Sequence, residues 1–480
     1  MSKFQFIDVT TYHSQLANGH TSCVEAVNFY LGQIETHKAL NAFVEVFAEE
    51  ALSKAASLDE KRKAGHPLKK LHGVVIAIKD VICYKGHRVT AASAMLKGFT
   101  SLIDATAIQL LLEEDAILIG NCNCDEFAMG SSNENSVYGN VLNAHDHSKV
   151  PGGSSGGSAV AVQANLCMIA LGSDTGGSVR QPADFCGIIG LKPGYGSVSR
   201  HGLIAYASSF DQIGIFGKQI EDVALTLEII SKPDEYDSTM EQDYFLKNMA
   251  AESNHKAESS YCVGIFDEVM QHPSLDPEIR NSILEKTNQL EKSNHKIVSF
   301  QFEWLDKIVP AYYVLTAAEA SSNLSRYDGI RYGHQSKEPL TDLNDFYIKN
   351  RTEGFGKEVK RRIMLGNFVL SSGYYDAYYS KAQQVRKLLV QRMEELFKQC
   401  DFIIMPCSPT TAFNIGAKQK DPIEMYLADI FTVFANLTGV PAIALPLFQH
   451  SNGMPFGLQV IGKRKDEAKL LSFSKMLMRK

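Results

Sequence analysis

Two clusters of glycine and serine constrain this chain more than any other feature of its sequence. They lie at Gly152–Ser158 and Gly172–Ser178, and an apolar run of small residues separates them. Glycine weakens regular elements, but it lets backbone N–H groups turn towards a ligand or approach it closely. A serine beside such a loop supplies a nucleophilic oxygen. The two clusters therefore predict one site that is assembled from two directions.

The composition indicates a soluble globular protein. The chain has 480 residues, of which 45% are hydrophobic, and these are enough for a large buried core. A net charge of −6 argues against a broad basic surface for nucleic acid, but leaves open a small basic patch or a partner that holds the nucleic acid. The first twenty residues lack the apolar segment of an export signal, and no apolar run reaches the length of a membrane-spanning helix. Nine scattered cysteines are typical of reduced thiols. We therefore expect a soluble, cytoplasmic protein.

The hydrophobic pattern predicts one large α/β domain, residues 1–480, with a central mixed sheet covered by helices. Residues 1–65 are expected to form a helical arm, in which Ser22 and Glu25 match a capping box. The short apolar runs Gly73–Asp80 and Ala116–Gly120 predict buried strands. Because a helix is expected between them at Thr106–Asp115, the two strands should run parallel.

Later segments continue the alternation of strands and helices. Helices are expected at Ala48–Lys63, Gly156–Asn165, Pro277–Ser293, Glu358–Tyr379 and Ala382–Phe397. Strands are expected at Cys167–Leu171, Val263–Phe266, Phe402–Met405 and Ala442–Leu445, the last two each closed by a proline.

The sequence gives only weak support for three kinds of site that glycine, serine, cysteine and histidine could form: a phosphate-binding loop, a nucleophile elbow and a zinc site. Neither glycine cluster has the lysine ending of a P-loop or the spacing of a dinucleotide-binding turn, which argues against phosphate binding. Ser155 is the central residue of a formal G-x-S-x-G match, but a nucleophile elbow needs a strand directly before it, and the preceding residues look like a loop. Cys122-x-Cys124 with His145-x-His147 departs from the usual spacings of zinc ligands.

Lys79 supports a different chemistry. It ends an otherwise apolar strand, where a lone lysine would usually extend its amine to solvent. Burial would instead lower its pKa from about 10.4 and allow the neutral amine to act as a base. A serine from each glycine cluster would then complete a relay of base, bridging hydroxyl and nucleophile.

The run Pro151–Pro193 resembles the amidase signature family, whose hallmark is G-G-S-S-G-G-S followed by G-[ST]-D-x-G-G-S-[IV]-R-x-P. Val75–Asp80 is similar to that family's lysine strand. Within the family, the chain is most similar to the A subunits of glutamyl-tRNA(Gln)/aspartyl-tRNA(Asn) amidotransferases. Segments that carry this narrower likeness include 125–132, 207–214, 359–366 and 371–379. The resemblance implies an amidase-signature core at about 70–220.

The resemblance also implies roles for particular residues. Ser178 would be the nucleophile, Lys79 the base and Ser154, preceded by a cis peptide bond, the bridge. The backbone N–H groups of Thr175, Gly176, Gly177 and Ser178 would form the oxyanion hole. For glutamine, Arg362 would bind the α-carboxylate and Asp429 the α-ammonium, with Tyr313 nearby. Arg361 and Tyr312 remain open as alternatives, because identical neighbours leave the register unsettled.

By resemblance, the chain would hydrolyse glutamine and pass ammonia to a B subunit, which would amidate Glu-tRNA(Gln) or Asp-tRNA(Asn). A small C subunit would complete the complex. No cofactor is expected in this chain, because ATP and magnesium would act mainly in the partner, and no membrane is involved. A stand-alone amidase acting on a small amide would share the relay, and an inactive assembly scaffold would not need it.

Overall fold

A mixed sheet of eleven strands organises the computed structural model, which describes residues 4–240, 260–417 and 428–479. The strand order is β1-β3-β2-β4-β6-β5-β10-β11-β9-β7-β8. The strands are β1 (Phe43–Val46), β2 (Val75–Lys79), β3 (Ile117–Cys122), β4 (Ile169–Asp174), β5 (Ile189–Lys192), β6 (Gln212–Gly217), β7 (Cys262–Phe266), β8 (Lys296–Phe300), β9 (Phe402–Pro406), β10 (Ala442–Gln449) and β11 (Pro455–Gly462).

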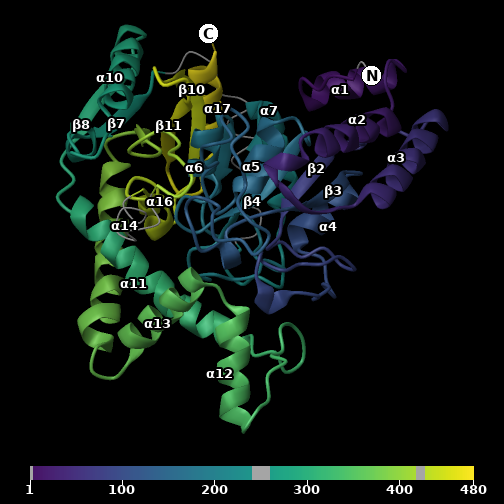
Figure 1. Cartoon of the computed structure of the whole chain (residues 1–480). Coiled ribbons are helices and arrows are strands. Elements are labelled where there is room, and N and C mark those ends of the chain that lie inside the picture. Colours follow the sequence, from purple (N-terminus) through teal and green to yellow (C-terminus); the bar gives the residue numbers. More distant parts are fainter. Residues whose placement is uncertain (1–3, 241–259, 418–427, 480) are drawn as a thin grey trace.

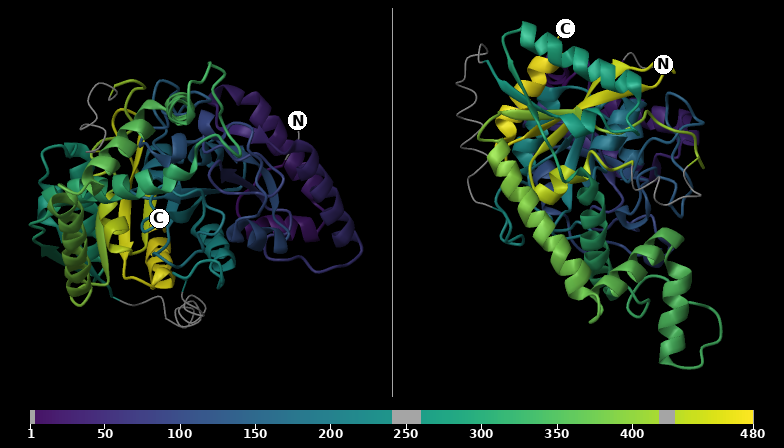
Figure 2. Two further views of the ribbon diagram at one scale, coloured as in Figure 1. Left: turned by 90° about the horizontal axis from the view of Figure 1, so that it is seen from below. Right: turned by 90° about the vertical axis from the view of Figure 1, so that its left-hand side faces the viewer.

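Helices cover the sheet and extend beyond it (Figure 1). They are α1 (Val9–Ala17), α2 (Cys23–Thr36), α3 (Ala48–Lys63), α4 (Thr106–Glu113), α5 (Gly156–Gln163), α6 (Arg180–Cys186), α7 (Ile220–Ile230), α9 (Asp267–Met270), α10 (Pro277–Lys292), α11 (Leu305–Asn323), α12 (Leu343–Gly354), α13 (Lys357–Leu370), α14 (Lys381–Leu396), α16 (Val433–Thr438) and α17 (Glu467–Met478). Figures 1 and 2 show α12 projecting away from the sheet. None of the helices in the described ranges combines the length and apolar character that crossing a bilayer requires.

The predicted mixed sheet is confirmed, and so are its central details. β2 and β3 run parallel, and β2 also pairs in parallel with β4, so all three are buried between neighbours. The Ser22 half of the expected capping box is present, because the Ser22 side chain accepts a hydrogen bond from the N–H of Glu25 at the start of α2, and the Glu25 carboxylate accepts one from Thr21 Oγ1. These local patterns agree with the tertiary environment, which explains why the sequence alone located them.

Three expectations of secondary structure were wrong. Residues 1–65 are not purely helical, because β1 pairs antiparallel with β3 at the edge of the sheet. The helix expected over Glu358–Tyr379 ends at Leu370, and Ser371 adopts an extended conformation before a separate π-helix at Asp376–Ser380. The strand expected to stop at Leu445 continues past Pro446 to Gln449, with its pairing to β11 interrupted between Leu445 and Phe448. Proline is tolerated at such an irregularity because no ladder hydrogen bond is required there.

The glycine-rich α5 lies at the centre of the molecule, and its residues from Gly156 to Val162 are all buried. A Cβ at Gly157 would collide with the backbone carbonyl oxygens of Asn123 and Ala42. The small residues of this helix therefore allow the first glycine cluster, which leads into α5, to lie against the second, which follows β4.

Candidate active site

Lys79 lies at the end of β2, fully enclosed in the protein. Its Nζ donates hydrogen bonds to Ser154 Oγ at 2.7 Å and to Ser173 Oγ at 2.9 Å. Burial lowers the pKa of Lys79 to about 8, although the nearby Cys124, Asp125, Asp174 and Asp211 act in the opposite direction. The amine therefore does not extend to solvent, and its neutral fraction, small near pH 7, is far larger than that of an ordinary lysine.

Ser154 is held by the loop that precedes α5. The Gly153–Ser154 peptide bond is cis, as the resemblance implies. The Ser154 carbonyl accepts a hydrogen bond from Asp125 N at 3.1 Å. The Asp125 carboxylate in turn accepts from the N–H groups of Asn133 and Asn135, so it fixes the loop that packs against Ser154.

Ser178 belongs to the second glycine cluster, and its carbonyl accepts a hydrogen bond from Ser155 N at 3.3 Å. This bond joins the two clusters, so the structure brings Ser178 beside the Lys79–Ser154 pair. Within the described part of the chain, the Ser178 hydroxyl makes no hydrogen bond, and the residue retains 8% of its surface exposed. Proton transfer from Ser178 to Ser154 stays a prediction, because the two hydroxyls are not hydrogen-bonded to each other.

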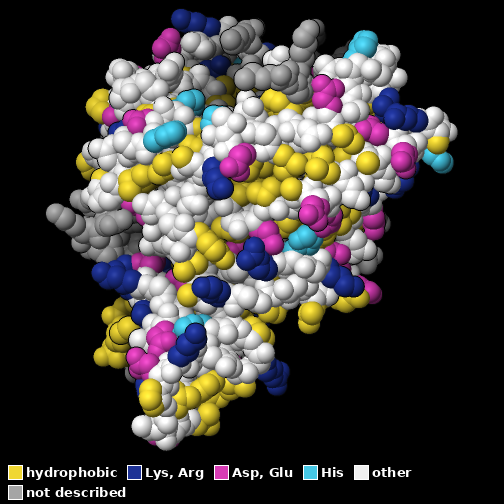
Figure 3. All heavy atoms as spheres, turned by 45° about the vertical axis from the view of Figure 1, so that its right-hand side comes forward, with side chains coloured by type: hydrophobic (Ala, Val, Ile, Leu, Met, Phe, Trp, Pro, Cys, Tyr) yellow, Lys and Arg dark blue, Asp and Glu magenta, His cyan; other side chains and the backbone are white. Residues whose placement is uncertain are grey.

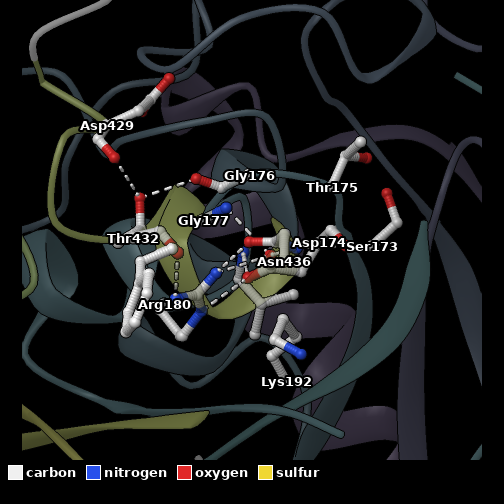
Figure 4. A network of polar contacts seen from close by, with 12 residues as sticks. Ser173, Asp174, Thr175, Gly176, Gly177, Arg180, Lys192, Asp429, Thr432 and Asn436 are labelled. Carbon is white, nitrogen blue, oxygen red and sulfur yellow. Dashed lines mark hydrogen bonds and ion pairs between the residues drawn. The ribbon is translucent and has the colours of Figure 1, made fainter. Parts of the chain in front are cut away.

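A buried ion pair shapes the turn that carries Ser178 (Figure 4). Asp174 accepts two hydrogen bonds from the Arg180 guanidinium and one each from Gly177 N and Val179 N. Arg180 also donates to the Thr432 carbonyl and to Asn436 Oδ1. Burial opposes ionisation of Asp174, but the charge of Arg180 outweighs it and holds the pKa of Asp174 below its usual range. The pair thus ties the Ser178 turn to α16.

The predicted oxyanion hole is only partly available. Gly177 N donates to Asp174 Oδ1 at 2.9 Å and is therefore already engaged. The N–H groups of Thr175, Gly176 and Ser178 have no acceptor among the described residues. Thr432 Oγ1 donates to the Gly176 carbonyl at 2.7 Å (Figure 4). A Cβ at Gly176 would collide with the Tyr312 hydroxyl. The structure therefore offers three free donors rather than four.

The three residues predicted to bind glutamine lie together. Asp429 Oδ2 accepts hydrogen bonds from Ser131 Oγ at 2.7 Å and from Tyr313 Oη at 3.1 Å. The Arg362 guanidinium lies 5.2 Å from the centre of the Tyr313 ring. Burial raises the pKa of Asp429 to about 6, although Ser131, Arg362 and Tyr313 oppose this shift. The Asp429 carbonyl also accepts a hydrogen bond from Thr432 N at 3.0 Å. Because Thr432 Oγ1 donates to the Gly176 carbonyl, this bond connects Asp429 to the turn that carries Ser178.

The structure also distinguishes the neighbouring candidates. Arg362 is only 4% exposed and donates to Glu358 and to the Tyr206 hydroxyl, whereas the Arg361 side chain is 38% exposed and pairs with Glu358. Arg362 is therefore the arginine that faces the cluster. Tyr312 and Tyr313 both reach the site, Tyr312 against Gly176 and Tyr313 against Asp429.

The alternative chemistries gain no support from the geometry. Ser155 Oγ is fully buried and exchanges hydrogen bonds with the backbone of Ser173, so it is not presented as an elbow nucleophile. Among the described residues, no group of His, Cys, Asp and Glu side chains is arranged to hold a metal ion. The four residues considered as zinc ligands, Cys122, Cys124, His145 and His147, therefore form no such group.

Comparison with known proteins identifies the family. The model of the family described as Amidase matches residues 25–471. The chain belongs to this amidase family. It is 48% identical over 464 residues to the A subunit of the glutamyl-tRNA(Gln) amidotransferase of Chlorobium phaeobacteroides, with 97% of each chain covered. The corresponding protein of Chlorobium luteolum is 48% identical over 99% of this chain and 97% of its own.

Solved structures agree with this family. The crystal structure of the A subunit of the Thermotoga maritima glutamyl-tRNA(Gln) amidotransferase superposes with a TM-score of 0.75 at 36% identity, covering 97% of this chain and 93% of its own. A peptide amidase from Stenotrophomonas maltophilia shares the fold, with a TM-score of 0.82, 24% identity and coverage of 99% and 97%. The amidase fold thus accommodates this chain over nearly its full length.

Sequence reasoning missed two functional neighbours in the amidase core. Ser173 binds the Lys79 amine, but a serine at the end of a buried strand gives no sign of this partner. Ser131 binds Asp429 across almost 300 residues of sequence. The only local signal for Ser131 is its place in the polar loop after Asp125.

Proposed function

We propose that this amidase-family chain is the glutamine-hydrolysing subunit of a tRNA-dependent amidotransferase. The observation that carries the proposal is the buried Lys79 amine, which is hydrogen-bonded to Ser154 in the loop that contacts the Ser178 turn. The identity to amidotransferase A subunits over nearly the whole chain supports this substrate class over a simple amide.

In this proposal, Ser178 Oγ attacks the side-chain carbonyl carbon of glutamine, and its proton passes through Ser154 to neutral Lys79. The negative oxygen of the tetrahedral intermediate accepts hydrogen bonds from the N–H groups of Thr175, Gly176 and Ser178. Lys79 returns the proton through Ser154 to the leaving nitrogen, so the C–N bond breaks and ammonia departs. Water then attacks the γ-glutamyl ester by the same route and releases glutamate and free Ser178.

The glutamine would be recognised through the two charged groups on its α-carbon. Asp429 would accept hydrogen bonds from the α-ammonium, while Arg362 would bind the α-carboxylate, because a guanidinium forks a carboxylate with two donors. Tyr313 holds Asp429 in place. Ammonia would pass to a B subunit that uses ATP and magnesium to amidate Glu-tRNA(Gln) or Asp-tRNA(Asn), and a small C subunit would complete the complex in the cytoplasm.

The test of the proposal is reconstitution. The chain is co-purified with the B and C subunits encoded by the same genome, and glutamine-dependent amidation of Glu-tRNA and Asp-tRNA is measured. We expect transamidation with glutamine as the amide donor. Hydrolysis of simple amides without any glutamine-dependent transamidation would instead assign the chain as a stand-alone amidase.

Arg362→Ala is expected to raise the KM for glutamine by about 100-fold, because a charge-assisted bidentate contact contributes roughly 1.5–3 kcal/mol. A substrate that lacks the α-carboxylate, such as a simple primary amide, should lose less than about threefold in kcat/KM. Arg361→Ala serves as the matched control, and it should leave both substrates nearly unchanged. Equal losses of kcat/KM for glutamine and the simple amide would show that Arg362 has a structural role and does not bind the α-carboxylate.

The pH dependence of kcat/KM should follow the two shifted groups of the site. Neutral Lys79 is the active form, so the rate should rise about tenfold per pH unit up to about pH 8 and then level off. Ionised Asp429 is needed to bind the ammonium, so below about pH 6 the slope should steepen to about two. A pH–rate profile that is flat between pH 6 and 8 would contradict the role of Lys79.

A further inference from the structure

The outer side of α12 and α13 carries an apolar groove of about 300 Å³. Tyr347, Ile348, Phe355, Ile363 and Met364 contribute its apolar lining, and Arg351 and Lys360 lie at the same groove. Ile348 is 64% exposed and Met364 72% exposed, although both are large hydrophobic residues. Its lining residues lie on and between α12 and α13, and α12 projects from the sheet (Figure 1). Figure 3 shows hydrophobic side chains gathered on the projecting lobe.

Exposed aromatic rings extend this groove along α13. Phe368 follows Met364 by one turn, so the two side chains share a helix face. The Phe368 ring lies 4.3 Å from Tyr374 and 5.7 Å from Tyr378, centre to centre, and all three side chains are more than 40% exposed. We call the groove and these three rings the α12–α13 face.

The chemistry of the α12–α13 face is that of a protein interface. Contiguous exposed apolar surface marks interaction sites, and Tyr, Phe, Met and Arg are enriched at the centres of protein interfaces. Aliphatic side chains such as Ile348 and Met364 add little to nucleic-acid binding, which depends on phosphate charge and on stacking. A protein is therefore favoured as the occupant.

The charge around the α12–α13 face favours an acidic protein partner over a second copy of this chain. Arg351 and Lys360 line the groove, no Asp or Glu is among its described lining residues, and Lys357 is exposed beside it on α13, whereas the whole chain carries a net charge of −6. A symmetric dimer would place these basic side chains against their own copies, and like charges facing each other oppose association. An acidic partner surface complements it.

We propose that the α12–α13 face docks another protein subunit of the amidotransferase, through a contacting surface with an apolar centre and an acidic rim. This inference rests on the proposed function, because that function supplies the partner chains. The inner side of the same helix holds Arg362, and Gly366 packs so closely on α11 that a Cβ would collide with the Ala317 carbonyl. The docked partner thus lies across α13 from the candidate glutamine-binding arginine.

The test compares a double variant, Ile348→Asp with Met364→Asp, with the wild-type chain for binding to the B and C subunits of the same genome. The dissociation constant is measured by analytical ultracentrifugation or calorimetry. Leu284→Asp is the matched control, because Leu284 is 37% exposed on α10, at the opposite end of the molecule from α12 (Figure 1). We expect the double variant to bind at least about 30-fold more weakly and the control to bind like the wild type. Lys357→Glu should also weaken binding, and added salt should weaken the wild-type complex.

Circular dichroism and the glutaminase activity of the isolated chain should be the same for the double variant and the wild type, which excludes misfolding. Wild-type binding with an unaffected double variant would overturn the docking site and leave the proposed function standing. A wild-type chain that binds neither partner would overturn the proposed function, and the inference with it. A self-associated wild type that the double variant converts to monomer would show that a second copy occupies the face.

Discussion

Ser178→Ala should lower glutamine hydrolysis by at least about 10⁴-fold, because removal of a nucleophile that acts within a relay eliminates the covalent route. The Ser178 hydroxyl makes no hydrogen bond within the described residues, so its removal should change the free energy of unfolding by less than about 0.5 kcal/mol. Glutamate release from the purified complex measures the loss. The variant should still assemble with its partners and still amidate tRNA when ammonia is added.

Ser155→Ala is the informative control for Ser178→Ala. Ser155 Oγ bonds to both the N–H and the carbonyl of Ser173, so its loss should lower the melting temperature by several degrees. Glutamine hydrolysis per folded molecule should fall by less than about tenfold. The opposite pattern, an inactive Ser155→Ala beside an active Ser178→Ala, would reassign the nucleophile.

The part of the site that the sequence predicts is the part built from contiguous, geometrically demanding residues. Lys79 ends an apolar strand, and Ser154 and Ser178 lie in turns whose neighbouring glycines admit no Cβ, so local composition already indicates unusual backbone. Arg362 and Asp429 have no such local signature. Only the family resemblance named them, and it is the burial of Arg362, with its contacts to Tyr206 and Tyr313, that separates it from Arg361.

The errors in the fold have the same physical origin. β1 is a four-residue strand at the sheet edge, with partly exposed side chains, so its pattern resembles a loop within a helical arm. Ser371–Gly373 interrupts a stretch that is otherwise favourable for helix, and a period-based prediction runs across it. Gly177 N was expected in the oxyanion hole, but a buried Asp174 carboxylate three residues earlier competes for it. Tertiary and side-chain contacts decide each of these points.

Lys79→Met is expected to lower glutamine hydrolysis by about 10³–10⁴-fold, because general-base catalysis contributes about that much. Lys79 is fully buried, and methionine keeps most of the length of its side chain, so the core should stay packed. The residual rate should lose the rise towards pH 8, because the group that titrates there is absent. Initial rates of glutamate release between pH 6 and 9 measure both effects.

Lys192→Met provides the comparison, because Lys192 is equally buried and burial likewise lowers its pKa, to about 7. Its Nζ donates to the Pro193 carbonyl and not to a serine of the relay. We expect a comparable change in melting temperature with less than a tenfold loss of kcat and an unchanged pH profile. If both lysine variants lost activity equally, and if Lys79→Met kept the rise towards pH 8, the buried amine at position 79 would be a structural group and another base would have to activate Ser178.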